Sequence, residues 1–367
     1  MLKKKILHLA KWYPNKEKPL LGVFVRKQIQ SIQNSYENKV ISLFETDEME
    51  TSIKRVNSRF ENIQEVTYYY KRGHLNKLKV FYFIWKEIKN SKSDWIHAHI
   101  ISWASTLAYL AKKTTKTPFI ISEHWSGYHT GLFKNQTWII KKLKRFVASK
   151  ATKLAVVSSY LKMDMLASGI KANYKVVGNV VEGKPENLEK NEQFTFIFVG
   201  DLEQSHKNTI GIITSFGSAL KSTKNIQLDI IGDGADKEKC IKLCESLDLT
   251  AHVNFKGSLS NNDVFKALSK SHVLILNSFY ETFSIICAEA LLSGIPVISS
   301  RCGGPEMFLN ERTGILIDTD NNKQLTHAML LMLNNYENYK PDELKKVAAQ
   351  FDRNKIGEEI KRLYELI

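Results

Sequence analysis

The chain has 367 residues, of which 43% are hydrophobic and 25% are charged. This composition excludes an intrinsically disordered protein, and the length allows two domains. No apolar run approaches the roughly 18 residues of a membrane-spanning helix, so we expect no integral membrane protein. The four cysteines form neither a disulfide framework nor a zinc motif, which favours a reducing, cytoplasmic location.

Positive charge is concentrated in the first half of the chain. Residues 1–180 hold 32 Lys and Arg against 12 Asp and Glu, whereas residues 181–367 hold 21 against 26. A half this basic is typical of proteins that bind nucleic acid or an anionic lipid surface, and solubility is the simplest alternative. Composition alone does not choose among the three.

Short β-branched segments alternate with longer amphipathic segments along the whole chain, which predicts parallel sheets covered by helices. The strands predicted in the first half are Ile6–Lys11, Lys39–Phe44, Val66–Tyr70, Trp95–His99, Phe119–Ser122, Lys153–Val157 and Lys175–Val177. Those predicted in the second half are Phe194–Val199, Gln227–Ile231, Val253–Phe255, Val273–Leu276, Val297–Ser299 and Ile315–Ile317. We therefore expect an α/β protein with two doubly wound domains that face each other across a cleft.

The domain boundary is predicted within residues 178–192. This stretch contains Gly, Pro and charged residues and has no apolar period, as is typical of a linker. A final helix is expected at Asn354–Ile367, and its single apolar stripe could pack on either domain.

The clearest chemical signal follows the predicted strand that ends at Leu276. Thr282 fits the N-cap of a helix that begins near Phe283. The free N–H groups at the start of that helix would point toward an anion, and they belong to Phe283, Ser284 and Ile285.

Two carboxylates accompany this predicted helix start. Glu281 precedes it and can reach hydroxyls beside the anion, while Glu289 can reach a diol lying across the helix. Together these groups suit a sugar nucleotide. The alternative for Glu289 is a solvated helix face, because acidic pairs at this spacing also arise by chance.

The segments after Glu289 make the pattern specific. Residues 290–298 combine a helix end, a Gly C-cap and a buried strand, and Cys302-Gly-Gly-Pro-Glu306 begins another turn that could hold a phosphate. In this order the parts resemble the donor-binding core of glycosyltransferase family 4, the retaining glycosyltransferases of the GT-B fold.

The resemblance extends over nearly the full length. Ile6–Pro14 with Gly22-Val-Phe-Val25 resembles the family's first strand and its glycine-bearing loop, and Phe198–Leu202 resembles the opening of the donor domain. It implies an acceptor-binding domain of residues 1–180 completed by a terminal segment, residues 351–367. It implies a donor-binding domain of residues 181–350.

The resemblance also implies a role for each matching residue. Glu281 would hold donor-sugar hydroxyls, and the backbone of Thr282–Ile285 would bind the sugar and the diphosphate. Glu289 would bind the ribose diol, and Lys207 would neutralise the diphosphate. In the first domain, His124 would lie near the sugar C6 and the anomeric carbon, and Gly22 would let its loop approach the phosphates.

One position departs from the family pattern. An Arg usually follows the glycine equivalent to Gly200, whereas this chain has Asp201, which would repel a diphosphate. His206 or a basic residue from elsewhere substitutes for that Arg, or Asp201 points away, or the diphosphate binds weakly.

We expect no metal site. Asp318-Thr-Asp320 has the form of a metal-binding Asp-x-Asp, but it follows a strand in a turn, where Asp is common. His97 and His99 alternate on one strand without a third ligand nearby in sequence, so core or cleft histidines are the simpler interpretation.

The segment Trp138–Val147 has the composition of an interfacial helix, with Trp138 and Phe146 as anchors among basic residues. An ordinary helix with a basic solvent face is an equal alternative. The basic residues of this segment are Lys141, Lys142, Lys144 and Arg145. Together with the basic first half, they suggest a peripheral protein on the inner face of an anionic membrane.

The leading hypothesis is a retaining, metal-independent glycosyltransferase without a cofactor. It would move a hexose from a nucleotide-diphosphate sugar, most simply a UDP-sugar, to a glycan or lipid-linked acceptor in cell-surface polysaccharide synthesis. A sugar-nucleotide epimerase or a phosphorylase on the same fold is the alternative enzyme. Charge alone supports a nucleic-acid-binding protein, because the sequence has no nucleic-acid-binding motif. We therefore expect no nucleic-acid partner.

Overall fold

The computed structural model describes residues 3–365 and divides into two compact units. Of the described residues, 3–180 and 353–365 belong to the first unit, and 181–352 belong to the second. The chain therefore leaves the first unit within the predicted linker. It returns at Arg353 rather than at residue 351, because the Phe351 ring packs on Phe283 and Phe308 of the second unit. The last two residues of the predicted terminal helix, 366 and 367, lie outside the described part.

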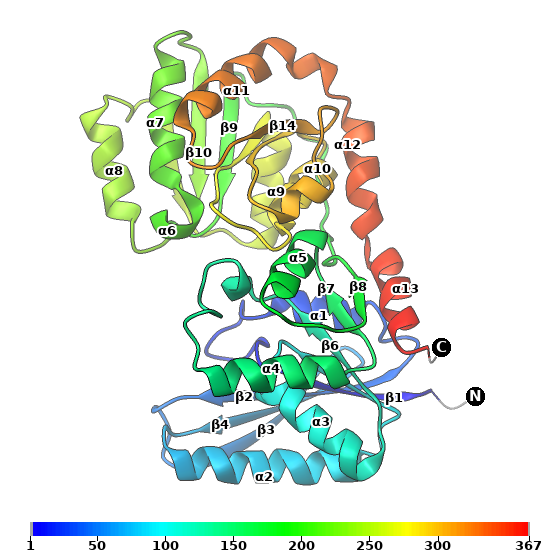
Figure 1. Cartoon of the computed structure of the whole chain (residues 1–367). Coiled ribbons are helices and arrows are strands. Elements are labelled where there is room, and N and C mark those ends of the chain that lie inside the picture. Colours follow the sequence, from blue (N-terminus) through cyan, green and yellow to red (C-terminus); the bar gives the residue numbers. More distant parts are fainter. Residues whose placement is uncertain (1–2, 366–367) are drawn as a thin grey trace. The chain divides into compact units, whose positions relative to one another are not determined.

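An eight-stranded sheet forms the first unit, in the order β3-β4-β2-β1-β5-β6-β7-β8 (Figure 1). Neighbouring strands run parallel except β3 and β4. The strands are β1 Lys5–Ala10, β2 Glu37–Glu45, β3 Ile53–Phe60, β4 Ile63–Tyr70, β5 Trp95–His99, β6 Phe119–Glu123, β7 Leu154–Val156 and β8 Tyr174–Val176. The helices are α1 Val23–Gln30, α2 His74–Ser91, α3 Trp103–Thr115, α4 Trp138–Lys150, α5 Ser159–Ala167 and α13 Arg353–Leu363.

Strand β3 was not predicted. Its sequence, Ile-Lys-Arg-Val-Asn-Ser-Arg-Phe, has no apolar alternation, and most of its side chains are exposed. It exists because it pairs antiparallel with β4 along its whole length at the edge of the sheet. Backbone pairing with a neighbouring strand supplies what the local sequence does not.

The second unit is a six-stranded parallel sheet in the order β11-β10-β9-β12-β13-β14. Counted along the unit, this is the strand order 3-2-1-4-5-6 of a Rossmann domain. The strands are β9 Phe194–Val199, β10 Ile226–Ile231, β11 Val253–Gly257, β12 Val273–Leu276, β13 Val297–Ser300 and β14 Gly314–Ile317. The helices are α6 Gln204–Lys207, α7 Thr209–Leu220, α8 Lys237–Ser246, α9 Asn261–Lys270, α10 Ile285–Leu292, α11 Asn322–Asn335 and α12 Pro341–Ala348.

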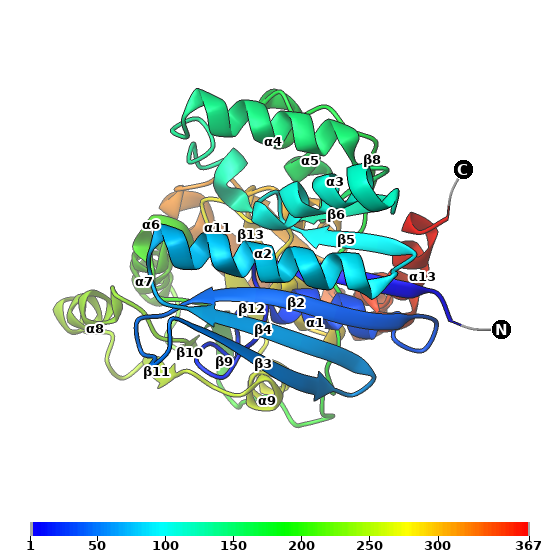
Figure 2. The same cartoon turned by 90° about the horizontal axis from the view of Figure 1, so that it is seen from below.

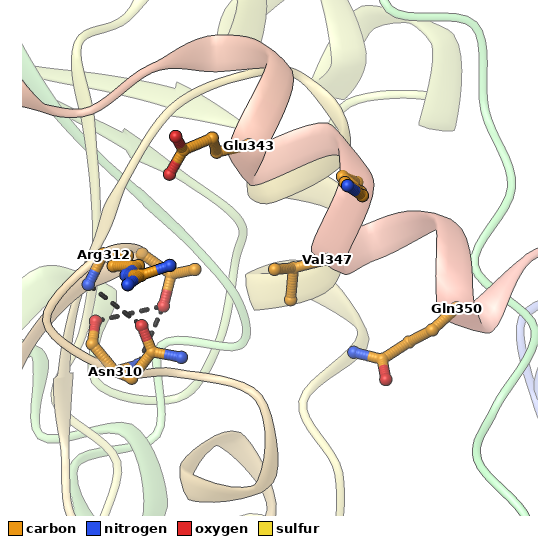
Figure 3. Close-up of a pocket in the computed structure, with 7 residues that line it drawn as sticks. Asn310, Arg312, Glu343, Val347 and Gln350 are labelled. Carbon is orange, nitrogen blue, oxygen red and sulfur yellow. Dashed lines mark hydrogen bonds between the residues drawn. The ribbon is translucent and has the colours of Figure 1, made fainter.

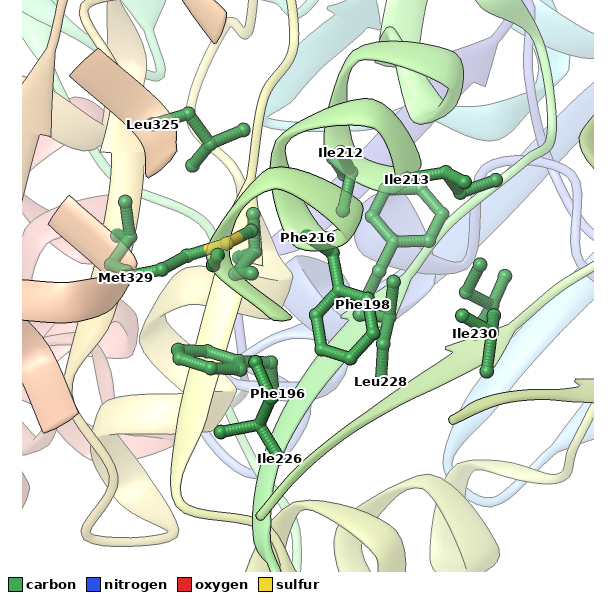
Figure 4. Close-up of a cluster of buried hydrophobic side chains, with 14 of the residues drawn as sticks. Phe196, Phe198, Ile212, Ile213, Phe216, Ile226, Leu228, Ile230, Leu325 and Met329 are labelled. Carbon is green, nitrogen blue, oxygen red and sulfur yellow. The ribbon is translucent and has the colours of Figure 1, made fainter. Parts of the chain in front are cut away.

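One face of this sheet is sealed by α7 and α11 (Figure 4). Phe196 and Phe198 of β9 point toward Phe216 of α7, and Met329 of α11 completes the cluster. Each of these side chains is fully buried. Because β9 is central and packed, the loops that follow it and β12 are held on a rigid support.

The predicted fold class is confirmed: both units are Rossmann-like α/β sheets, and every predicted strand is present within a few residues. Over residues 3–365, none of the helices combines the length and apolarity needed to cross a bilayer.

Candidate functional site

Strand order reverses between β9 and β12 in the second unit, and these two strands are direct neighbours. At such a point the loops after the two strands separate to opposite faces and leave a crevice at their carboxyl ends. Lys207 comes from the segment after β9, and Glu281 comes from the loop after β12. The topology therefore brings together two residues that were predicted to bind the donor.

Lys207 and Glu281 form an ion pair at this point. Lys207 Nζ lies 2.6 Å from Glu281 Oε1, and the Ser278 hydroxyl donates to the same oxygen at 2.8 Å. The two charged side chains are only 13% and 12% exposed. Burial opposes the ammonium form, but the carboxylate of Glu281 and its hydrogen bond outweigh that effect and raise the pKa of Lys207.

The backbone around Glu281 is tied to the loop after β13. The N–H of Glu281 donates to Cys302 O at 2.7 Å, and the N–H of Gly304 donates to Glu281 O at 2.8 Å. A Cβ at Gly304 would lie 2.4 Å from Phe283 Cα, so only glycine permits this approach. The second glycine of the predicted phosphate turn thus has a structural role beside Glu281.

The predicted start of the next helix was wrong. Thr282 is not an N-cap, because α10 begins at Ile285 and its N-cap is Ser284, with φ at +66°. Pairing of residue 281 with the β13 loop keeps the chain out of a helix here, and the buried Phe283 ring anchors it. Of the three N–H groups expected at a helix end, only that of Ile285 lies in the first helical turn.

Glu289 lies on α10 and is 6% exposed, so the alternative of a solvated helix face is wrong. The side-chain amide of Asn261, at the start of α9, lies 3.5 Å from its Oε1. Burial of a carboxylate is costly unless polar groups contact it. Helix propensity alone therefore does not explain a glutamate at this position.

The sequence departure at Asp201 is accommodated without burying that residue. Asp201 is exposed, and its charge contributes to the raised pKa of Lys207. His206 Nε2 lies 2.7 Å from the carbonyl oxygen of Tyr280, and Phe279 N–H donates to His206 O at 2.9 Å. His206 therefore holds the loop that follows β12 beside Lys207. One nitrogen of its ring is engaged in this contact.

In the first unit, Gly22 and His124 are linked through Phe24. Gly22 is the N-cap of α1 with φ at +68°, and a Cβ there would lie 2.4 Å from Trp12 O. The Phe24 ring lies 4.6 Å from the His124 ring, centroid to centroid. His124 is 7% exposed, its ring nitrogens have no hydrogen-bond partner among the described residues, and burial lowers its pKa to about 3.

The position of His124 depends on Glu123, which sequence analysis did not select. The carboxylate accepts hydrogen bonds from the N–H groups of His124 and Trp125, both at 2.9 Å, and from that of Ile101 at 2.9 Å. It is fully buried, and burial raises its pKa. An acidic residue at the end of a buried strand that begins with Phe119-Ile-Ile121 was the signal that could have identified it.

His8 joins His97 and His99 in a buried cluster that sequence separation concealed. His8 Nδ1 lies 3.1 Å from His99 Nε2, and its Nε2 lies 3.0 Å from Asn38 Oδ1. The two nitrogens of His97 lie 2.7 Å from the hydroxyls of Tyr364 and Ser122.

The rings of His97 and His99 are stacked, with centroids 4.2 Å apart. Both nitrogens of His8 and of His97 are engaged, which favours a neutral hydrogen-bonded network, whereas His99 Nδ1 has no hydrogen-bond partner among the described residues. Burial lowers the pKa of all three histidines, which agrees with neutral rings.

Comparisons with known proteins show the family to which this chain belongs. The model of the glycosyl transferases group 1 matches residues 180–351, and that of glycosyltransferase family 4 matches residues 32–182. The chain belongs to glycosyltransferase family 4. The predicted family and enzyme class are thereby confirmed.

Individual relatives of this glycosyltransferase agree with that placement. A lipopolysaccharide 1,6-galactosyltransferase of Salmonella typhimurium is 33% identical over 156 residues, which are 41% of this chain and 43% of the relative. The lipopolysaccharide outer core galactosyltransferase WaaB has a TM-score of 0.76 at 20% identity, over 98% of both chains. Anabaena HepE in complex with UDP-glucose has a TM-score of 0.71 at 16% identity, again over 98% of both.

A separate pocket of the glycosyltransferase lies away from these residues (Figure 3). It has a volume of about 530 Å³ and is lined by Asn310, Arg312, Thr313, Glu343, Lys346, Val347 and Gln350. The loop that lines it enters β14 at the amino end of the strand, whereas Lys207 and Glu281 follow the carboxyl ends of theirs. This pocket therefore contains none of the predicted donor-binding residues.

Proposed function

We propose that this glycosyltransferase moves a hexosyl group from a UDP-sugar to a hydroxyl of a glycan or lipid-linked glycan, with retention of configuration and without a metal ion. The observation that carries the proposal is the ion pair of Lys207 and Glu281 at the strand-order reversal of the donor-type domain. UDP-glucose in the structure of Anabaena HepE, and the galactosyltransferase relatives, support the choice of donor and of cell-surface polysaccharide synthesis.

Lys207 is the group that would bind the diphosphate. A departing nucleoside diphosphate gains negative charge as the glycosidic bond breaks, and a fixed cation stabilises that charge most where water is excluded. Lys207 is 13% exposed and charged, and its neighbour Glu281 holds it in place. On this proposal it supplies the positive charge that a metal ion supplies in other transferases.

Glu281 would bind hydroxyls of the donor sugar, and the backbone of Thr282–Ile285 would contact the sugar and the diphosphate. Glu289 would bind the ribose diol. In the first domain, which we assign to the acceptor, His124 would contact the donor sugar, and Gly22 would let its loop approach the phosphates. The ring nitrogens of His124 are buried and have no hydrogen-bond partner within residues 3–365, which supports its assignment.

Retention is proposed to occur by front-face substitution. The acceptor hydroxyl oxygen bonds to the anomeric carbon while the bond from that carbon to the β-phosphate oxygen breaks. The hydroxyl proton passes to the departing phosphate oxygen, so no protein nucleophile is needed. Glu281 then acts as a binding residue whose contacts tighten as the sugar gains oxocarbenium character.

We also propose that the enzyme works on the inner face of an anionic membrane. Of the four basic residues suggested by the sequence, Lys142 is exposed, but Lys144 faces inward, with its Nζ 4.3 Å from the centre of the Trp125 ring. Arg145 donates to Ser168 O at 3.0 Å. Each Lys or Arg near such a surface contributes roughly 1 kcal/mol to the free energy of membrane binding. The basic residues of this one helix are therefore too few, and those of neighbouring helices are needed as well.

The test of the donor is a thermal-shift screen with UDP, GDP, ADP and the matching sugar nucleotides. A ligand at about one hundred times its Kd adds about 2.7 kcal/mol of stability. We expect UDP to stabilise the protein most. Product analysis by NMR should then show the donor's anomeric configuration; an inverted product, an epimerised donor or no response to any nucleotide would refute the proposal.

A further inference from the structure

Helix α3 lies between α2 and α4 in the first unit (Figure 2). All three helices carry large apolar side chains that are exposed, among them Phe83, Leu110 and Trp138. Helix α4 buries only Val147 and Ala148. Its other large apolar side chains, which include Trp138 and Ile139, are between 42% and 69% exposed. Contiguous exposed apolar surface of this kind marks an interaction site.

A groove crosses this surface between the three helices. It has a volume of about 550 Å³, within the roughly 300–1,000 Å³ of small-molecule pockets. Its walls are formed by Phe81 of α2, by Trp103, Leu107 and Leu110 of α3, and by Ile140 and Leu143 of α4. The ring centroids of Phe81 and Trp103 lie 6.2 Å apart and form an aromatic wall. Such a lining suits a hydrocarbon ligand.

The charge around the groove identifies the class of ligand. Across the residues of α2, α3 and α4 there are eleven Lys and Arg and one acidic residue, Glu87. Glu87 is already paired with Lys39 and Arg55, each at 2.6 Å. A second copy of this chain would bring the same positive charge to the contact. An anionic partner with apolar chains matches both properties of the surface.

We infer that the groove between α2, α3 and α4 takes the hydrocarbon chain of an anionic bilayer lipid, while the surrounding lysines contact lipid headgroups. The inference rests on the proposed membrane association and adds a specific binding site to it. A groove that holds a chain converts adsorption by charge alone into partial insertion. The acceptor-type domain would then be held at the surface where a lipid-linked acceptor is found.

The test compares two variants that add the same positive charge. Leu110→Arg places a cation in the groove, whereas Leu247→Arg changes a side chain of the second unit that is exposed to a similar degree, 43% against 45%. We expect Leu110→Arg to weaken cosedimentation with phosphatidylglycerol vesicles at least tenfold, because burial of the leucine is lost. Leu247→Arg should cosediment as the wild type does, and all three should bind a cation-exchange resin with similar strength.

Fluorescence quenching locates the chain directly. In the Trp138→Phe variant, vesicles with brominated acyl chains should still quench the protein, and additional removal of Trp103 should abolish most of that quenching. Equal vesicle binding by the two arginine variants, or quenching that does not depend on Trp103, would overturn the inference. Failure of the wild type to bind vesicles would overturn it as well. The donor proposal is judged separately, by stabilisation of the same variants with UDP.

Discussion

Lys207 Nζ and Glu281 Oε1 are 2.6 Å apart although 74 positions separate the two residues in the chain. The pair is largely shielded from water, so each charge depends on the other. A nucleotide-sugar that brings both a diphosphate and hydroxyls to this point can satisfy both members of the pair. Substitutions at the two residues should therefore have different effects on binding and on turnover.

Glu281→Gln should reduce turnover by orders of magnitude and leave the affinity for UDP nearly unchanged. The substitution keeps the shape of the side chain but removes the charge that would tighten on the sugar hydroxyls in the transition state. Steady-state kinetics and calorimetry with UDP measure the two effects. Near-normal transfer by this variant would contradict the assignment.

Lys207→Met should reduce both the turnover and the affinity for UDP. Removal of the cation takes away the proposed diphosphate contact and leaves Glu281 without its partner, and loss of one such stabilising donor typically lowers kcat by about 10² to 10³. The matched control is Lys237→Met, which removes a partly exposed cation that pairs with Asp233 in the same unit. If both variants bind UDP equally well, Lys207 does not contact the diphosphate.

Glu289→Ala should weaken binding of free UDP by about 1.5–3 kcal/mol, which is typical for a hydrogen bond to a charged group. Asn261→Ala, which leaves the carboxylate of Glu289 intact, is the control for disturbance of α9 and α10. Calorimetry with UDP and with its 2′,3′-dideoxy analogue, which keeps the diphosphate but lacks the diol, shows whether the loss requires the diol. Unaltered affinity of Glu289→Ala for UDP would rule out the ribose contact.

Gly22→Ala should destabilise the first unit more than Gly131→Ala. Both glycines have positive φ, +68° and +82°, which costs a residue with a Cβ roughly 1–2 kcal/mol. A Cβ at Gly22 would also meet Trp12 O at 2.4 Å, whereas at Gly131 nothing lies within 4 Å. Urea unfolding of the two variants measures the difference, and equal losses would show that the loop simply moves aside.

Acidification should destabilise the first unit through its buried histidines. Burial lowers the pKa of His8 from 6.5 to about 4, so between these values the unfolded chain binds a proton that the folded chain does not. The stability is therefore complete above pH 6.5 and is lost as the pH falls toward 4, by on the order of 3 kcal/mol for His8. The raised pKa of Glu123 acts in the opposite direction.

Urea unfolding at pH 7 and at pH 4.5 measures how steeply the free energy of unfolding falls with pH. A His8→Asn variant has no proton to bind at this position and should show a shallower pH dependence. An identical slope in the two proteins would mean that His8 is already protonated in the folded state.

Much of the fold was determined locally by the sequence. Runs such as Phe194–Val199 and Val273–Leu276 are apolar and β-branched, so their strands follow from composition over a few residues. Glu281 could be selected for a related reason, because a polar loop after a buried parallel strand is where such sheets bind ligands. The charge asymmetry of the two halves is likewise a property of sequence alone.

Tertiary structure decided what depends on distant backbone. Strand β3 exists through its pairing with β4, and α10 begins at Ile285 because the backbone at residue 281 pairs with the loop that carries Gly303. Likewise, the distance between Lys207 and Glu281 is set by the adjacency of β9 and β12. A pattern within a window of residues carries no information about which distant segment will supply a hydrogen bond or a counter-charge, because those contacts are formed only when the chain packs.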